Sequence, residues 1–126
     1  MATLLRLART AEIEPSAAAG KYTGVAGLDD GFIHLSTASQ ARSTAALYFK
    51  AATDLVLLAF DTASLADAGL EVRYEAAVPG APGVEKREGD FPHCYGGPIP
   101  WSCLSEEPIP LPLDDNGEHV FPERVH

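Results

Sequence analysis

Three short stretches of the sequence place polar side chains two residues apart. The pairs are His34 with Ser36, Arg73 with Glu75, and His93 with Tyr95. Side chains of an extended chain alternate between its two faces, so both members of a pair point the same way in a strand. One such pair more often makes a local hydrogen bond or a surface ion pair. Three pairs in one short chain favour a shared cleft containing imidazoles, a carboxylate, a guanidinium, a hydroxyl and a phenol.

Several chemistries use groups of this kind. Two histidines and Glu75 offer ligands for zinc or iron, although their spacing matches no known local metal motif. Two-histidine phosphodiesterases carry two copies of His-x-Ser/Thr; residues 34–36 fit one copy, whereas residues 93–95 lack the second hydroxyl. The sequence has no G-x-S-x-G nucleophile elbow, no P-loop and no Rossmann glycine pattern.

The composition is that of an ordinary globular protein. The chain has 126 residues, 46% of them hydrophobic and 21% charged, which predicts a single domain over residues 1–126. No apolar run approaches the roughly 20 residues that cross a bilayer, so no membrane partner is expected. Arg6 and Arg9 interrupt the apolar start of the chain, which therefore does not look like a signal peptide and predicts a cytoplasmic protein.

Net charge and cysteine content narrow the partners further. The formal charge is −9, whereas a duplex-binding protein presents a basic face, so nucleic acid is not the expected partner. A small nucleotide held by one or two local arginines remains compatible with this charge. Cys94 and Cys103 are too few for a disulfide framework and form no C-x-x-C pair, so we expect buried thiols and no metal.

The regular elements expected around these residues give an α+β class. Strands are predicted at 3–9, 32–36, 54–61 and 71–78, and segment 54–61 should be central because it is apolar throughout. A short helix should start with Thr10 as its N-cap, be limited by Pro15 and end at Gly20.

The main helix is expected over residues 37–53. Thr37 and Gln40 have the spacing of a capping box, and four residues recur at helical intervals: Ala41, Ala45, Tyr48 and Ala52. Segment 62–70 should be a turn or a short helix.

Two proline-rich stretches predict irregular structure. Segment 79–90, with three glycines and two prolines, should be an exposed flap beside residues 91–93. The tail 106–126 carries four prolines, so any strand in it should lie at a sheet edge, and residues 115–117 should form a turn.

Four stretches together resemble the family known as domain of unknown function 952. The first is D-G-F-I-H-x-S-x-x-x-Q, matched by seven residues: Asp30, Gly31, Phe32, Ile33, His34, Ser36 and Gln40. The others are the strand at 54–61, a W-E pair represented by Tyr74 and Glu75, and F-P-H-x-Y-G at 91–96. The resemblance covers about residues 3–105 and leaves 106–126 as an extension. The chain departs from the pattern in the extra Gly97, a longer 79–90 loop and a missing tryptophan near Ile13.

This resemblance implies the fold and chemistry of the ADP-ribosyltransferase-like superfamily. The implied fold is a split mixed or antiparallel sheet around an NAD-binding cleft, with one main helix. His34 and Ser36 would contact the nicotinamide ribose, and Tyr48 or Tyr95 would pack on nicotinamide. Glu75 would stabilise the oxocarbenium ion, while Arg73 and His93 would meet pyrophosphate or the acceptor.

Two functional hypotheses follow from the residues and the resemblance. The first is an NAD-using transferase or glycohydrolase with His34 and Glu75 as catalytic residues. The second is a non-catalytic module on the same scaffold that binds a nucleotide or a modified group. Glu75 discriminates between them, because a transferase needs its carboxylate whereas a binding module tolerates glutamine.

Overall fold

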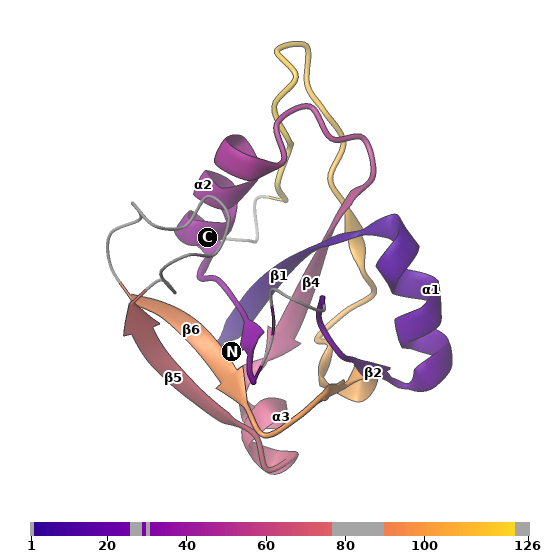
Figure 1. The fold of residues 1–126 in the computed structure, drawn as a ribbon. Helices are drawn as coiled ribbons and strands as arrows, with labels where there is room; N and C mark the ends of the chain where they lie inside the picture. Colours follow the sequence, from indigo (N-terminus) through magenta and orange to yellow (C-terminus); the bar gives the residue numbers. More distant parts are fainter. Residues whose placement is uncertain (1, 26–28, 30, 77–89, 123–126) are drawn as a thin grey trace.

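The computed structural model describes residues 2–25, 29, 31–76 and 90–122. Its elements, in chain order, are β1 (Thr3–Arg9), α1 (Thr10–Ala19), β2 (Lys21–Tyr22), β3 (Ile33–His34), α2 (Ala38–Tyr48), β4 (Leu55–Asp61), α3 (Thr62–Asp67), β5 (Glu71–Ala76), β6 (Asp90–Tyr95), β7 (Ile99–Pro100), a 3-10 turn at Trp101–Cys103, and β8 (Ile109–Pro110) (Figure 1). The predicted α+β class is therefore correct.

The described strands form three small antiparallel sheets. Their orders are β1-β4-β8, β2-β7 and β3-β6-β5. A bridge between Leu5 of β1 and Ser36, two residues beyond β3, joins the first sheet to the third. Every pairing in the described part of the chain is antiparallel, so the mixed alternative does not apply there. The expectation of one main helix was wrong, because α1 has 10 residues and α2 has 11.

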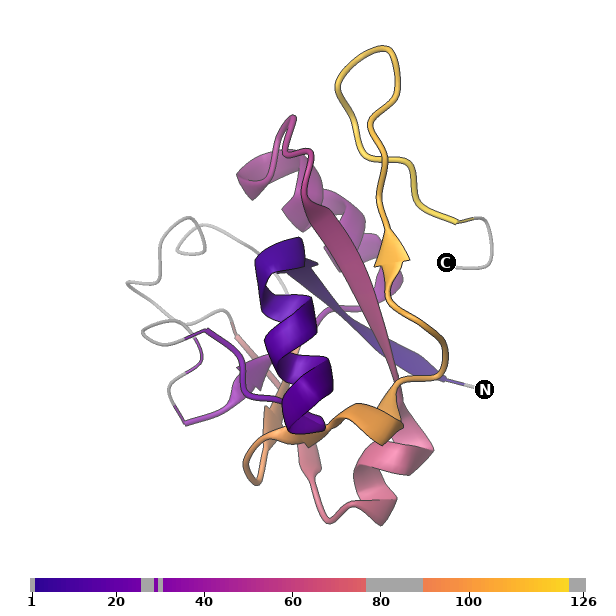
Figure 2. The same cartoon turned by 90° about the vertical axis from the view of Figure 1, so that its right-hand side faces the viewer.

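The strand β4 is the interior strand that its apolar sequence predicts. It lies between β1 and β8, and its residues from Leu55 to Phe60 are all buried. One face packs against the small side chains of α2, Ala38, Ala41 and Ala45. The other face packs against the second core cluster, which contains Tyr22 and Leu65. Figure 2 shows α1 and α2 beside this sheet, with the C-terminal segment passing its edge.

Local capping fixes where the two longer helices begin and end. Thr37 and Gln40 form the predicted capping box of α2. That helix ends at Tyr48 rather than 53, because its C-cap, Phe49, has left the helical backbone with a φ of −124°, and Ala51 then has a positive φ of 62°. The N-cap of α1 is Arg9 and not Thr10, since the Glu12 carboxylate accepts the Arg9 backbone N–H at 2.6 Å.

The third sheet has one apolar face and one polar face, as side-chain alternation predicts. Ile33 of β3 and Cys94 of β6 face the core. In the neighbouring row, His34 lies opposite His93, and His93 lies opposite Arg73 of β5. Directly opposed residues share a face. The polar face of this sheet therefore gathers residues from three separate segments.

The remaining predictions concern the loops and the tail. Strand β8 lies at the edge of its sheet, as expected for a proline-containing strand. The predicted turn is formed around Asp114, whose carboxylate accepts the backbone N–H groups of Asn116 and Glu118. The predicted flap at 79–90 lies outside the described residues except for Asp90. Among the described helices, none is both long and apolar enough to cross a membrane.

Candidate functional site

Two histidines lie side by side on the polar face of the third sheet. The rings of His34 and His93 meet edge to face, with their centroids 5.2 Å apart. Strand pairing produces this contact, because the two residues are directly opposed in β3 and β6. The structure thus brings together one histidine from each of two predicted polar pairs. The third joins them through Glu75 of β5.

Asp29 holds His34 from the edge of β3 that faces away from β6. Its Oδ1 atom lies 2.9 Å from His34 Nδ1 and accepts the His34 backbone N–H at 2.9 Å. The backbone N–H of Leu35 instead donates to Pro92 of β6. Because backbone groups alternate in direction along a strand, Asp29 and β6 lie on opposite sides of β3.

Arg6 of β1 completes the support of Asp29. Its two terminal nitrogens donate to the two Asp29 oxygens at 2.8 and 2.7 Å, and Nη1 also donates to the His34 carbonyl at 2.9 Å. The side chains are 8% and 1% exposed. Burial alone would raise the pKa of Asp29, but the hydrogen bonds from His34 and Arg6 and the Arg6 charge lower it well below its ordinary value. Asp29 is therefore a carboxylate.

Glu75 holds His93 in the same way from the other side of the site. Its Oε1 atom lies 2.9 Å from His93 Nδ1 and also accepts the Tyr95 hydroxyl. The hydrogen bond from Tyr95, followed by that from His93, lowers the pKa of Glu75. Reciprocally, the hydrogen bond to Glu75 raises the pKa of Tyr95. Glu75 is therefore ionised at neutral pH, and its side chain is 40% exposed.

The two carboxylates decide which nitrogen of each ring carries hydrogen. An ionised carboxylate only accepts hydrogen bonds, so the Nδ1 atoms of His34 and His93 must donate. In the neutral rings, each Nε2 atom is then an acceptor. Both Nε2 atoms are buried, and neither has a hydrogen-bond partner among the described residues. Buried acceptors without partners are costly, so this pair is suited to a ligand that brings donors.

Phe32 covers the paired imidazoles. Its ring stacks on His93 at 4.3 Å and lies 4.8 Å from His34 and 5.0 Å from Tyr95. The aromatic cluster explains why the His93 side chain is only 2% exposed although it carries a polar edge. A ligand that reaches both Nε2 atoms must displace or slide past this ring.

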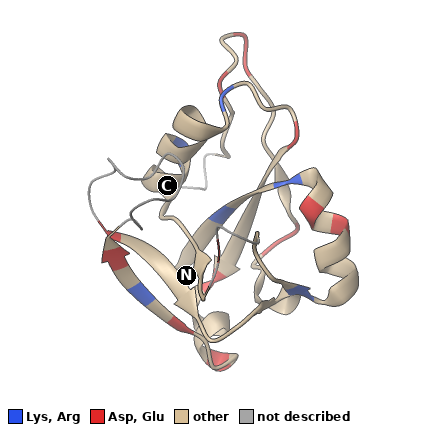
Figure 3. Cartoon of the chain, in the orientation of Figure 1, with Lys and Arg blue, Asp and Glu red and all other residues tan. Residues whose placement is uncertain are grey.

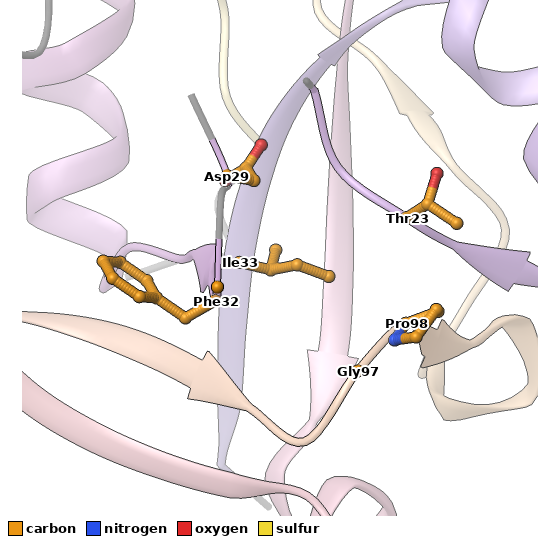
Figure 4. Close-up of a pocket in the computed structure, with 7 residues that line it drawn as sticks. Thr23, Asp29, Phe32, Ile33, Gly97 and Pro98 are labelled. Atoms are coloured by element: carbon orange, nitrogen blue, oxygen red, sulfur yellow. The ribbon is translucent and has the colours of Figure 1, made fainter. Parts of the chain in front are cut away.

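A pocket of about 200 Å³ adjoins Phe32. Figure 4 shows Thr23 and Pro98 on one side of it, facing Ile33, with the Phe32 ring turned away from them. Asp29, Gly31 and Gly97 complete the lining. A side chain added at Gly31 or Gly97 would meet no atom within 4 Å, so both glycines border open space.

The other residues predicted for the site lie at its margin or farther away. Arg73 lies over the Tyr95 ring at 4.6 Å, with its Nε atom donating to Glu71 at 2.6 Å. Ser36 is half-buried at the bridge to Leu5, and no hydrogen bond among the described residues joins it to either histidine. Tyr48 is the last residue of α2, beyond the alanines that pack on the first sheet, and its side chain is exposed.

Figure 3 shows how charge is distributed around this site. Acidic and basic residues alternate along β5, which carries Glu71, Arg73 and Glu75 on one face. Arg73 is engaged by Glu71 and Arg6 by Asp29, so the described cations near the imidazoles already have carboxylate partners. The described residues contain no group of three or more histidines, cysteines or acids placed to hold a metal ion.

Sequence reasoning missed three residues of the site, Asp29, Arg6 and Phe32. Asp29 stands before an Asp-Gly pair that predicts a turn, and a turn residue alone does not indicate a partner for His34. Arg6 was interpreted only as an interruption of an apolar start. A lone arginine within an apolar strand is itself a usable sign, because a buried guanidinium requires an acidic partner.

The two cysteines are free and buried, as predicted. Burial raises the pKa of Cys94 to about 11 and that of Cys103 as well, so neither thiol is activated.

The sequence matches the family model described as "Protein of unknown function (DUF952)" over residues 7–106. The chain belongs to this family. The match spans the pairing partner Asp29, both histidines and Glu75. No curated protein matches the chain at a significant level.

Solved structures of protein CC0527 from Caulobacter crescentus have the same fold. The crystal structure is 31% identical, covers 98% of both chains and gives a TM-score of 0.76. A double mutant of that protein, also 31% identical with 98% of both chains covered, gives 0.75. The solution structure is 33% identical, covers 94% of this chain and 91% of that one, and gives 0.73.

Proposed function

We propose that this chain binds a nucleotide at the His34–His93 pair and acts on the nicotinamide–ribose bond of NAD, as a transferase or glycohydrolase of the ADP-ribosyltransferase-like kind. The observation that carries the proposal is the pair of buried Nε2 acceptors that have no hydrogen-bond partner within the described part of the chain. A ribose supplies two adjacent hydroxyl donors, which is the chemistry that two neighbouring acceptors recognise. NAD is the proposed substrate, and the two free thiols suit a reducing cytoplasmic setting.

Glu75 supplies the charge that this reaction requires. Cleavage of the nicotinamide–ribose bond develops positive charge on the sugar, and a fixed carboxylate stabilises that charge more than it stabilises the substrate. Tyr95 and His93 hold Glu75 in place and keep it ionised. Because the Glu75 side chain is 40% exposed, its carboxylate is accessible from the polar face.

The remaining predicted residues receive subordinate roles in this proposal. His34 binds the ribose and helps to orient the reacting sugar. Tyr95, with Arg73 over its ring, offers a surface on which nicotinamide packs. Ser36 and Tyr48 stay predictions for the ribose and the nicotinamide, while Arg73 and His93 stay candidates for pyrophosphate or the acceptor.

The test combines binding and turnover in the full chain. Thermal shift and calorimetry with NAD should show stabilisation of the folded protein, and release of nicotinamide should be detected by chromatography. Glu75→Gln should abolish nicotinamide release, while Glu71→Gln on the same face of β5 should leave it unchanged. Absence of both NAD binding and nicotinamide release would refute the proposal.

A binding module without catalysis is the second candidate. It is favoured by the two hydrogen bonds that Glu75 Oε1 accepts, one from His93 and one from Tyr95. These bonds give Glu75 a role in holding the site together, which needs no catalysis. In this case Glu75→Gln keeps NAD affinity, since glutamine still offers an oxygen acceptor, and wild-type protein releases no nicotinamide. Measuring both NAD affinity and nicotinamide release, in the wild type and in Glu75→Gln, therefore separates the two functions.

A further inference from the structure

We infer that Asp29 is a positioning residue that fixes His34 in the tautomer with hydrogen on Nδ1, leaving Nε2 as the acceptor offered to a ligand. The inference deepens the proposed function, on which it rests only for the identity of that ligand. Asp29 belongs to neither the predicted site residues nor the segment 30–40 that carries the family motif in the sequence.

The contacts of Asp29 leave it no freedom. Its Oδ1 atom accepts the backbone N–H of His34 and meets His34 Nδ1, both at 2.9 Å. Its Oδ2 atom accepts the backbone N–H of Val25 at 2.7 Å, and Arg6 donates to both oxygens. A carboxylate held by four donor groups cannot rotate, so the imidazole that donates to it is held at the same angle.

The direction of these contacts matters as much as their number. Asp29 binds His34 from the outer edge of β3, whereas His93 lies across the inner edge. Glu75 binds His93 from β5, on the far side of β6. The two carboxylates thus flank the imidazole pair, and each draws an Nδ1–H outward. The Nε2 edges are left for the interior of the cluster, where both are buried without partners among the described residues.

Asp29 and Glu75 differ in their setting. The Asp29 side chain is 1% exposed and carries the Arg6 ion pair, whereas Glu75 is accessible on the surface. Although Asp29 is one of the pocket-lining residues, its carboxylate is buried and fully engaged by protein donors, so it acts through the ring that it holds. Asp29 is therefore assigned to positioning and not to contact with substrate.

The first experiment reads the tautomer directly in the wild-type protein. Nitrogen-15 NMR of the histidine side chains, at a pH where His34 is neutral, distinguishes a ring nitrogen that carries hydrogen from one that does not. We expect hydrogen on Nδ1 and a bare Nε2 in His34. Hydrogen on Nε2 would overturn the inference, whether or not the protein binds NAD.

The second experiment removes the carboxylate. In Asp29→Asn the new amide nitrogen can donate to Nδ1, so we expect His34 to shift toward the tautomer with hydrogen on Nε2. NAD affinity should fall roughly tenfold, as expected for one lost well-oriented hydrogen bond. Asp54→Asn is the matched control, because Asp54 also pairs with an arginine, Arg9, but on the surface. A folded Asp29→Asn protein with an unchanged His34 tautomer would overturn the inference.

The two readouts keep this inference separate from the proposed function. A wild-type protein with hydrogen on His34 Nδ1 and no affinity for NAD refutes the nucleotide proposal and upholds the role of Asp29. A wild-type protein that binds NAD with hydrogen on Nε2 does the reverse. If Asp29→Asn does not fold, the nitrogen-15 measurement on the wild-type protein decides the inference alone, because hydrogen on Nε2 of His34 overturns it.

Discussion

His34 and His93 are directly opposed in neighbouring strands, and each is held at Nδ1 by a carboxylate from the outer side of the pair. Asp29, His34, His93 and Glu75 therefore form a row of four side chains in contact, from the outer edge of β3 to β5. The row places two buried acceptors in its middle and two negative charges at its ends. The predictions below rest on this arrangement.

Replacement of His34 by alanine should remove nucleotide binding without unfolding the protein. Asp29 keeps its bonds to Arg6, Val25 and the His34 backbone, so the supporting network survives the loss of the ring. The melting temperature and NAD affinity of His34→Ala should be compared with those of His119→Ala, which removes a histidine bonded to Ala52. Unchanged affinity with a large fall in melting temperature would assign His34 a structural role instead.

Tyr95→Phe should raise the pH at which Glu75 titrates. The hydrogen bond from Tyr95 is the first cause of the lowered pKa of Glu75, so its removal favours the protonated carboxyl. Carbon-13 NMR of the Glu75 carboxyl measures the shift. Tyr74→Phe is the control, because Tyr74 is exposed and lies on the other face of β5. If the Glu75 carboxyl titrated at the same pH in both variants, the hydrogen bond from Tyr95 would not be what lowers its pKa.

The Arg6–Asp29 pair should make the protein sensitive to acid. The folded state holds the pKa of Asp29 below the value of 3.8 that it has in an unfolded chain. Its contribution to the free energy of unfolding is complete above that value and is lost as the pH falls below it. The free energy of unfolding should then decrease by up to about 1.4 kcal/mol for each unit that the pH falls.

Urea unfolding between pH 5 and pH 2 (about one unit above and two below this value) measures the effect. Asp54→Asn, at an exposed ion pair, should keep the acid slope of the wild type. Asp29→Asn should lose the part of the slope due to Asp29 and be less stable at neutral pH. Equal slopes in Asp29→Asn and the wild type would show that the buried pair does not govern acid unfolding.

The sequence predicted which side chains share a face but not what orients them. Strand alternation placed His34, Arg73, Glu75, His93 and Tyr95 together, because parity along a strand depends on sequence alone. Pairing of His34 with His93 depends on the register between strands nearly sixty residues apart, which the sequence does not encode locally. Face parity therefore indicated only part of the site, the two histidines with Glu75 and Tyr95, and the register between the strands set its geometry.

The supporting residues were hidden for a different physical reason. Asp29 lies in a bend, where the direction of a side chain does not alternate as it does in a strand. Its partner Arg6 comes from β1, which is distant in the sequence. Phe32 is an apolar residue of the type expected in a core, yet its ring packs on polar rings. Tyr48 recurs at the helical interval but falls at the exposed end of α2, beyond the part that packs on the sheet.

Phe32→Ala should open the imidazole pair to solvent. The ring stacks on His93, so its removal takes away a contact that covers the imidazole. Carbethoxylation of His93 should become several times faster, at a stability cost of about 1–3 kcal/mol for a half-buried ring. Phe49→Ala, at a partly buried phenylalanine packed by Arg9, controls for general loosening. Equal acceleration in both variants would contradict a local cover.

Gly24→Ala should disturb Asp29 more than the strain of its own backbone accounts for. Gly24 has a φ of +79°, and a Cβ atom added there would lie 2.8 Å from both the Cβ and Oδ2 atoms of Asp29. Gly20→Ala is a matched control, because Gly20 has a φ of +75° with no atom within 4 Å of the added carbon. Both variants should lose about 1–2 kcal/mol from the left-handed backbone. Gly24→Ala should lose about 1–3 kcal/mol more, because Asp29 is buried and its displacement strains the Arg6 pair.

Chemical denaturation measures the difference, and nitrogen-15 NMR of His34 reports whether its tautomer changes with it. Equal losses with an unchanged His34 signal would show that Asp29 yields to the added methyl group and is not held rigidly.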